Sequence, residues 1–148
     1  MQSTQEAMKL AAAALCPPEV TCAVVREGAV AATQSGLGVK PIRTLLATDP
    51  DLLKGAVVAD TVIGKAAAML LVRAGVVAVH GTVMSRSAAD LLDQYQLPHR
   101  CDELVPMIIN RTGDDMCPLE KSVLEIEDLD EAAAAIEATV ARLMAQKK

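Results

Sequence analysis

The hydrophobic residues at the start of the chain follow two different periods. Residues 3–15 are rich in alanine at helical spacing, and the pair Pro17-Pro18 ends this predicted helix. Residues 21–26 and 29–33 are short apolar runs on either side of Glu27-Gly28. A two-residue turn between two such runs predicts a β-hairpin.

The middle of the chain changes from a strand pattern to a helix pattern. Residues 56–60 form a short apolar run, which is typical of a strand that is buried on both faces. Residues 62–74 are apolar nearly all round, so we expect a central helix there. Asp60 or Thr61 can cap the start of this helix, and Gly75 marks its end.

The other elements follow from the same two periods. Further strands are expected at 76–82, 100–104 and 107–110. Further helices are expected to begin at Pro41, at Ser85 or Ser87, at Cys117-Pro118, and at Asp128 or Asp130. A hairpin followed by alternating helices and strands indicates an α/β fold with at least one parallel strand pair, and the chain reads as one domain over residues 1–148.

The composition removes several classes of function. The chain has 148 residues, 52% of them hydrophobic, but Tyr95 is its single aromatic residue and its net charge is −5. Nucleic-acid binders need clustered basic residues or aromatic stacking platforms, so we expect no nucleic-acid partner. No apolar stretch reaches the length of a membrane span, and the four cysteines are too scattered for a disulfide framework. We therefore expect a cytoplasmic protein that does not bind a membrane.

Asp60 and Lys65 are the first candidates for chemistry. Asp60 ends the buried strand, and ligands of open α/β sheets bind beyond the carboxyl ends of strands. Lys65 lies in the first turn of an otherwise apolar helix, where the helix dipole disfavours a cation, so an anion should lie close to it. The alternative is structural: Asp60 only caps the helix, and Lys65 extends to water.

Cys117 is the second candidate. Pro118 at the first helical position makes Cys117 the predicted cap, where free backbone N–H groups favour a thiolate. The acidic residues Asp114 and Asp115 just upstream oppose this, because a nearby negative charge raises the pKa of a thiol. Cys117 is thus either an activated nucleophile or a capping residue of the fold.

Two weaker patterns concern anions and metals. Gly36 and Gly38 precede a helix, where backbone donors can cradle an anion, but this signal is weak and a plain loop explains them better. His99 and Cys101 would share one face of a strand, but no second close pair of ligands accompanies them. We therefore expect neither a metal nor any other cofactor.

Three phrases of the sequence form a recognisable set: Val57-Val-Ala-Asp-Thr-Val-Ile-Gly-Lys-Ala-Ala-Ala68, Gly81-Thr-Val-Met-Ser85, and the stretch from Leu104 to Glu120 that contains Met116-Cys-Pro-Leu-Glu120. They resemble the uncharacterised prokaryotic family called domain of unknown function 1893, within the cytidine-deaminase-like superfamily. The resemblance implies a three-layer α/β/α fold with a mixed sheet.

The resemblance also implies where a site would lie. In that superfamily the N-termini of two helices meet at the active site, which here would bring Asp60, Thr61 and Lys65 towards Ser85 and Ser87. Residues from Asn110 and Arg111 to Cys117 would form a third wall. Zinc deaminases carry H-x-E and P-C-x-x-C at these helix starts, and neither motif occurs in this chain.

Two hypotheses follow for function. In the first, the chain is an enzyme or binding domain for a small anionic or nucleotide-like molecule, with Asp60, Lys65 and Cys117 in one pocket. In the second, it is an inactive ligand-sensing or assembly module, in which the same residues stabilise the fold. The high apolar content with few large side chains also leads us to expect a homodimer.

Overall fold

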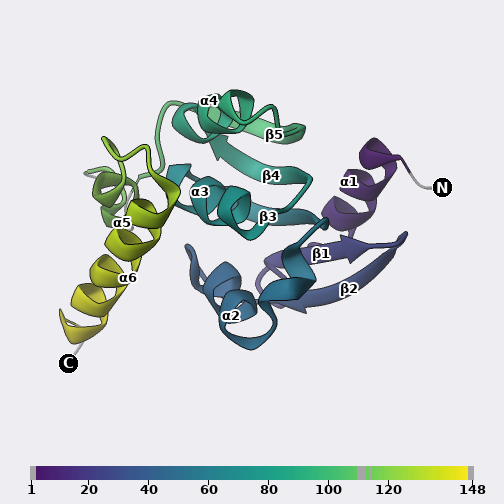
Figure 1. The fold of residues 1–148 in the computed structure, drawn as a ribbon, viewed down its shortest axis with the longest axis horizontal. Helices are drawn as coiled ribbons and strands as arrows, with labels where there is room; N and C mark the ends of the chain where they lie inside the picture. Colours follow the sequence, from purple (N-terminus) through teal and green to yellow (C-terminus); the bar gives the residue numbers. More distant parts are fainter. Residues whose placement is uncertain (1–2, 110–112, 114, 147–148) are drawn as a thin grey trace.

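A mixed five-stranded β-sheet forms the centre of the computed structural model, which describes residues 3–109, 113 and 115–146. The strand order is β2-β1-β3-β4-β5. The strands are β1 (Cys22–Arg26), β2 (Ala29–Gln34), β3 (Val57–Ile63), β4 (Ala78–Ser85) and β5 (His99–Val105). β1 runs antiparallel to both β2 and β3, whereas β3, β4 and β5 are mutually parallel. The carboxyl ends of the three parallel strands therefore share one edge of the sheet (Figure 1).

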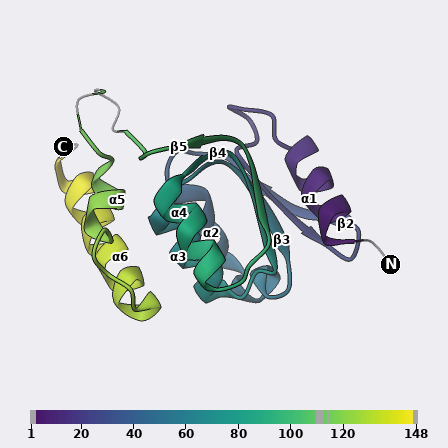
Figure 2. The same cartoon turned by 90° about the horizontal axis from the view of Figure 1, so that it is seen from above.

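Helices cover both faces of this sheet. They are α1 (Thr4–Ala13), α2 (Lys40–Thr48), the short 3₁₀ helix η1 (Pro50–Leu53), α3 (Lys65–Ala74), α4 (Arg86–Gln94), α5 (Pro118–Ser122) and α6 (Leu129–Gln146). Figure 2 shows α1 alone on one face, with α2, α3 and α4 on the other and α5 and α6 farther out beyond α3. The α/β class and the mixed sheet predicted from the sequence are confirmed.

The core is made of small and medium aliphatic side chains. Helix α3 lies between the sheet and α6, and Ala68, Met69 and Leu71 on it are fully buried. A second cluster under α1 includes Ala11 and Val57. Because alanines occupy many contact positions, the helices approach the sheet closely, and a chain without Phe or Trp still fills its interior.

Most predicted elements are confirmed within one to three residues. The hairpin turns at Glu27-Gly28, Pro41 lies in the first turn of α2, and the Ser85 side chain caps α4 by accepting a hydrogen bond from the Ala88 N–H. Asp128 Oδ1 likewise accepts from the Asp130 and Glu131 N–H groups at the start of α6. These predictions were correct because capping and turn residues determine these element boundaries locally.

Two expectations about secondary structure are wrong. The helix expected at 62–74 begins only at Lys65, because Thr61, Val62 and Ile63 are β-branched and extend β3, and Gly64 is the N-cap. Asp60 and Thr61 therefore do not cap this helix. Within the described part of 107–110 no strand forms, and Ile109 makes only an isolated bridge with Met116. Among the described residues, no helix is both long and apolar enough to cross a membrane.

Candidate functional site

Five chain segments meet at the end of the sheet where β3 and β4 stop. We call this region the carboxyl edge and define it by Thr21, 36–38, 60–64, 85–87 and 117–120. Thr21 Oγ1 donates a hydrogen bond to the Gly36 carbonyl (3.0 Å), and the Thr61 N–H donates to the Thr21 carbonyl (3.0 Å). A Cβ atom on Gly38 would lie 3.5 Å from Leu119 Cδ1, which shows that the loop before α2 contacts α5.

Asp60 is the most unusual residue of the carboxyl edge. It lies within β3, opposite Cys22 of β1 and Gly81 of β4, and its residue surface is 3% exposed. Its Oδ1 atom accepts hydrogen bonds from the Val62 N–H (3.3 Å) and the Thr61 hydroxyl (3.5 Å). Its Oδ2 atom has no hydrogen-bond partner among the described residues. A buried carboxyl oxygen without a partner is costly, so it calls for an explanation.

The electrostatics of Asp60 follow from this burial. Removal from water raises the pKa of the Asp60 carboxyl to about 7, against the opposing effect of the hydrogen bonds from Val62 and Thr61 and, most weakly, of the nearby Cys22 thiol. Burial, followed by the nearby Asp60 carboxylate, raises the pKa of the Cys22 thiol well above its usual range. Asp60 can therefore exchange a proton near neutral pH, while Cys22 keeps its proton.

The side chain of Glu120, a residue of α5, binds the N-terminus of α3. Its carboxylate accepts hydrogen bonds from the backbone N–H groups of Lys65 (2.7 Å) and Ala66 (3.0 Å), the positions where a helix binds anions. Burial raises the pKa of Glu120, while these two bonds and the Lys65 charge lower it. A Cβ atom on Gly64 would overlap the Glu120 carboxylate, so the glycine allows this close approach. The chain thus supplies its own anion to α3.

Lys65 does not pair with Asp60. Its ammonium group donates to the Leu124 carbonyl (3.0 Å), just beyond α5, and no ion pair joins it to Asp60 in the part of the chain that the structure describes. The anion expected near Lys65 is therefore Glu120, whose carboxylate contacts the Lys65 N–H. Lys65 binds the α5 region through both its backbone and its side chain.

Cys117 is the N-cap of α5, as its position before Pro118 predicted. It is half-buried, its side chain makes no capping hydrogen bond, and its N–H donates to the Ile108 carbonyl (2.8 Å). It lies three residues before Glu120, which touches α3. The short helix α5 therefore brings Cys117 and Lys65 to the same region, although no hydrogen bond joins their side chains among the described residues.

The remaining predicted residues divide into three groups. Thr61, Gly36 and Gly38 lie in the hydrogen-bonded loops of the carboxyl edge. Ser85 and Ser87 lie at the start of α4, where their hydroxyl oxygens are 3.1 Å apart. Asn110 and Arg111 lie outside the described residues. No three His, Cys, Asp or Glu side chains of the described part are placed to hold a metal ion.

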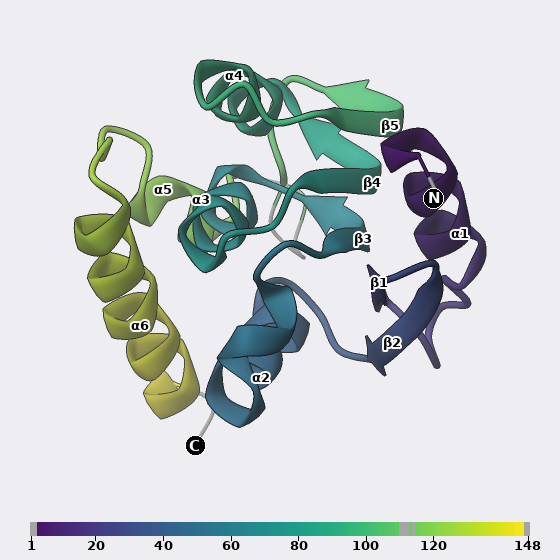
Figure 3. The ribbon, with the colours of Figure 1, turned by 45° about the vertical axis from the view of Figure 1, so that its right-hand side comes forward.

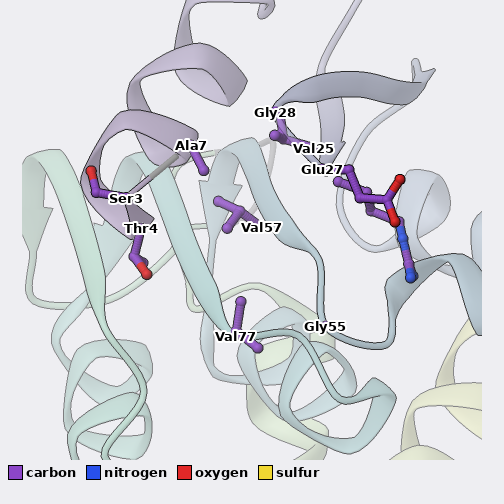
Figure 4. Close-up of a pocket in the computed structure, with 10 residues that line it drawn as sticks. Ser3, Thr4, Ala7, Val25, Glu27, Gly28, Gly55, Val57 and Val77 are labelled. Carbon is purple, nitrogen blue, oxygen red and sulfur yellow. The ribbon is translucent and has the colours of Figure 1, made fainter. Parts of the chain in front are cut away.

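The hollow that Figure 4 shows lies at the opposite end of the parallel strands. It has a volume of about 430 Å³ and is lined by the start of α1, the β1–β2 turn and the segments before β3 and β4. Its lining includes Ser3, Thr4, Glu27, Val57 and Val77. It contains none of the predicted site residues, so it is distinct from the carboxyl edge.

Comparison with known proteins identifies the family. The family model described as "Domain of unknown function (DUF1893)" matches residues 11–140. The chain belongs to this family. The crystal structure of a DUF1893 family protein from Thermotoga maritima is similar, with a TM-score of 0.72 and 29% sequence identity over 83% of this chain and 80% of that one. The comparison with curated proteins found no match.

Sequence reasoning missed Glu120 of the carboxyl edge and Cys22, which lies opposite Asp60. Glu120 contacts residues that are 54 and 55 positions away, and nothing in the local sequence distinguishes it from other acidic residues of a short helix. Cys22 faces Asp60 only through the antiparallel register of β1 and β3. An isolated Gly64 before a helix start was the one available signal for a close approach.

Proposed function

We propose that the carboxyl edge binds a nucleotide-like small molecule, with Asp60 as the side chain that recognises it. The observation that carries the proposal is the buried Asp60 Oδ2 atom, which has no hydrogen-bond partner among the described residues. Asp60 lies within the central strand β3, three residues before its carboxyl end, and open α/β sheets bind ligands beyond the carboxyl ends of their strands. A bound ligand would satisfy the oxygen that the protein leaves without a partner.

The chemistry of Asp60 favours one part of such a ligand. A carboxyl group with a pKa of about 7 can donate from one oxygen and accept at the other. The edge of a cytosine or adenine base offers the complementary pair, an amino donor next to a ring-nitrogen acceptor. The resemblance to cytidine-deaminase-like proteins supports the same ligand class. We therefore propose that Asp60 binds the base.

The starts of α3 and α4 offer few free backbone donors for an anionic part of the ligand. Glu120 already occupies the N-terminus of α3, and Ser85 already caps α4. The base is therefore the part of the ligand that the carboxyl edge recognises in this proposal. Because Asp60 is almost fully buried, ligand binding requires segments of the carboxyl edge to move apart.

A catalytic role would use three residues. Asp60 would move a proton to or from the bound base, the Lys65 ammonium would polarise an oxygen of the ligand, and Cys117 would form the opposite wall or attack as a nucleophile. The chain lacks the H-x-E and P-C-x-x-C motifs of zinc deaminases, so we propose no deamination.

The alternative is an inactive sensing or assembly module. The internal pairing of Glu120 with the α3 N-terminus, and of Lys65 with Leu124, favours it because these residues already stabilise the fold. In that case Asp60 would be a buried acid with no ligand of its own.

Calorimetric titration with cytidine, cytidine 5′-monophosphate and inorganic phosphate tests the proposal. We expect cytidine and its monophosphate to bind more tightly at about pH 6 than at about pH 8, because protonated Asp60 both donates and accepts. Asp60→Asn keeps both functions, so its binding should not depend on pH in this range. Asp60→Ala should weaken binding about tenfold or more, whereas Asp90→Asn on exposed α4 should change nothing.

Two results would overturn the proposal. Equal binding by Asp60→Ala and the wild-type protein would remove Asp60 from the site. Absence of binding by cytidine and its monophosphate would exclude the nucleotide-like ligand and favour the assembly module, whether or not phosphate alone binds.

A further inference from the structure

Strand β5 carries a charge pattern that is symmetric about its cysteine. Its first five residues are His99, Arg100, Cys101, Asp102 and Glu103, so two basic residues precede Cys101 and two acidic residues follow it. β5 is also the last strand of the sheet, and Figure 3 shows it at the free edge with α4 beside it. An edge strand of this length can pair with a further strand.

The hydrogen bonds to β4 determine which backbone groups of β5 face outwards. The Val79 N–H donates to the Pro98 carbonyl (3.1 Å), and β5 pairs with β4 in parallel, with Val79 opposite His99 and Gly81 opposite Cys101. In a parallel ladder with this phase, Arg100 and Asp102 direct their N–H and C=O groups towards β4. The backbone groups of His99, Cys101 and Glu103 therefore point away from the sheet.

We propose that β5 pairs with β5 of a second copy of this chain, antiparallel and with the two-fold axis at Cys101. Each Arg100 then lies opposite Asp102 of the second copy, and each His99 opposite its Glu103. The outward backbone groups of His99, Cys101 and Glu103 make the hydrogen bonds that join the two sheets into one of ten strands, twice the five of a single chain.

The charged side chains of β5 favour this register over the neighbouring registers. The outward groups face one another only when the axis passes through a residue, because a half-residue shift would bring outward groups opposite inward ones. An axis at Arg100, Asp102 or Glu103 would place two identical charges directly opposite each other, which destabilises a strand pair. The register centred on Cys101 pairs Arg100 with Asp102 twice and places no like charges opposite each other within this five-residue segment.

The surroundings of β5 leave room for a partner. A groove of about 520 Å³ lies between α4 and β5 and is lined by residues that include Arg86, Cys101 and Leu104. Among the described residues, Arg100 and Glu103 have no ion pair, and Leu104 is 44% exposed. Asp102 Oδ1 lies 3.9 Å from His80 Nε2, and His99 Nε2 lies 3.6 Å from Asp93 Oδ1. We expect the Arg100–Asp102 pairs to contribute more than the His99–Glu103 pairs, because Arg100 is always charged.

A charge-exchange experiment tests both the interface and its register. The wild-type chain should be a dimer in sedimentation and light scattering at micromolar concentration. Arg100→Asp and Asp102→Arg should each weaken self-association about tenfold or more, because each places like charges opposite each other twice. An equimolar mixture of the two variants should form a heterodimer, since every 100–102 pair then joins opposite charges.

Two control variants should dimerise as the wild type does. The double variant Arg100→Asp/Asp102→Arg should dimerise like the wild type, and Arg73→Asp on α3, away from β5, should leave dimerisation unchanged. A monomeric wild-type chain would overturn the proposal. So would single variants that dimerise as well as the wild type, or a mixture that forms no heterodimer.

Cys101 provides an independent test of the register. Residues that exchange both backbone hydrogen bonds have Cα atoms about 5.5 Å apart, which a disulfide can span. In a Cys16→Ser/Cys117→Ser chain, diamide should take two electrons and two protons from the two Cys101 thiols and leave a disulfide-linked dimer. Adding Cys101→Ser should abolish this product. Absence of the product from the Cys101-containing chain would contradict an axis at Cys101.

Discussion

The two buried carboxylates of the carboxyl edge differ in how the fold treats them. Glu120 accepts two backbone N–H bonds at the start of α3, and Gly64 leaves space for it. Asp60, within the strand that leads into the same helix, has one oxygen without a partner among the described residues. Burial raises the pKa of both groups. Their hydrogen bonding separates them: Glu120 completes the fold, whereas Asp60 retains an unused acceptor.

This difference separates structural from functional residues at the carboxyl edge. A helix N-terminus would normally be the first choice for an anionic ligand. Here it is filled by Glu120, and Lys65 is held by the Leu124 carbonyl. The unfilled position is the Asp60 carboxyl, so we propose that Asp60 recognises the ligand and that Glu120 stabilises the fold.

Gly64→Ala should give the largest effect. The new Cβ atom would overlap the Glu120 carboxylate and displace it from α3, so we expect a loss of about 3 kcal/mol or more in unfolding free energy. Chemical denaturation of the variant measures it. In a Glu120→Ala background the same change should cost less than about 1 kcal/mol, because the φ of Gly64 (−96°) suits alanine. Equal costs in the two backgrounds would show that the close approach is unimportant.

Asp60→Asn should change how stability depends on pH. The pKa of Asp60 is about 7 in the fold and near 3.8 when exposed, so the folded state holds the proton longer. Stability from this group is therefore full below about pH 4 and falls as the pH rises to about 7. Between about pH 5 and pH 7 the wild type should lose on the order of 2 kcal/mol relative to Asp60→Asn. Parallel curves for the two proteins in urea unfolding would mean that Asp60 titrates normally.

Glu120→Gln should have an intermediate effect. Glutamine keeps one acceptor oxygen but loses the charge and the second hydrogen bond at the α3 N-terminus, so we expect a loss of about 1–2 kcal/mol. Glu127→Gln, which changes an exposed carboxylate, is the matched control. Denaturation of both variants measures the difference. No difference between them would place Glu120 among ordinary surface carboxylates.

The fold could be predicted where local chemistry determines it. The Glu27-Gly28 turn, the Ser85 cap and the Cys117-Pro118 start all follow from residues within a few positions of one another. The start of α3 was placed too early because the helical apolar pattern continues through Thr61 to Ile63, where β-branched side chains and pairing with β4 favour a strand.

The place of the carboxyl-edge residues in the fold was predictable, but their internal pairing was not. Asp60, Thr61 and Ser85 could be assigned to the carboxyl edge because strand ends and helix starts are visible in the sequence. The partners of Asp60 and Lys65 could not, since Cys22 reaches Asp60 through strand register and Glu120 reaches α3 across more than fifty residues. Long-range contacts of single polar residues leave no periodic signal in one sequence.

Cys22→Ser should give the smallest effect and tests the environment of Asp60 most directly. Cys22 is fully buried opposite Asp60, and its protonated thiol is only a weak donor to the carboxyl. A serine hydroxyl there donates a stronger hydrogen bond to the carboxylate, so the pKa of Asp60 should fall. The upper limit of the pH range over which the fold loses stability should then fall with it. NMR titration of the Asp60 side-chain carboxyl carbon measures the midpoint, with exposed Cys16→Ser as the control. An unchanged midpoint would mean that Cys22 does not bond to Asp60, and that the unpartnered oxygen is unreachable from β1. A lowered midpoint would show that one added donor suffices to satisfy the oxygen that we assign to the ligand.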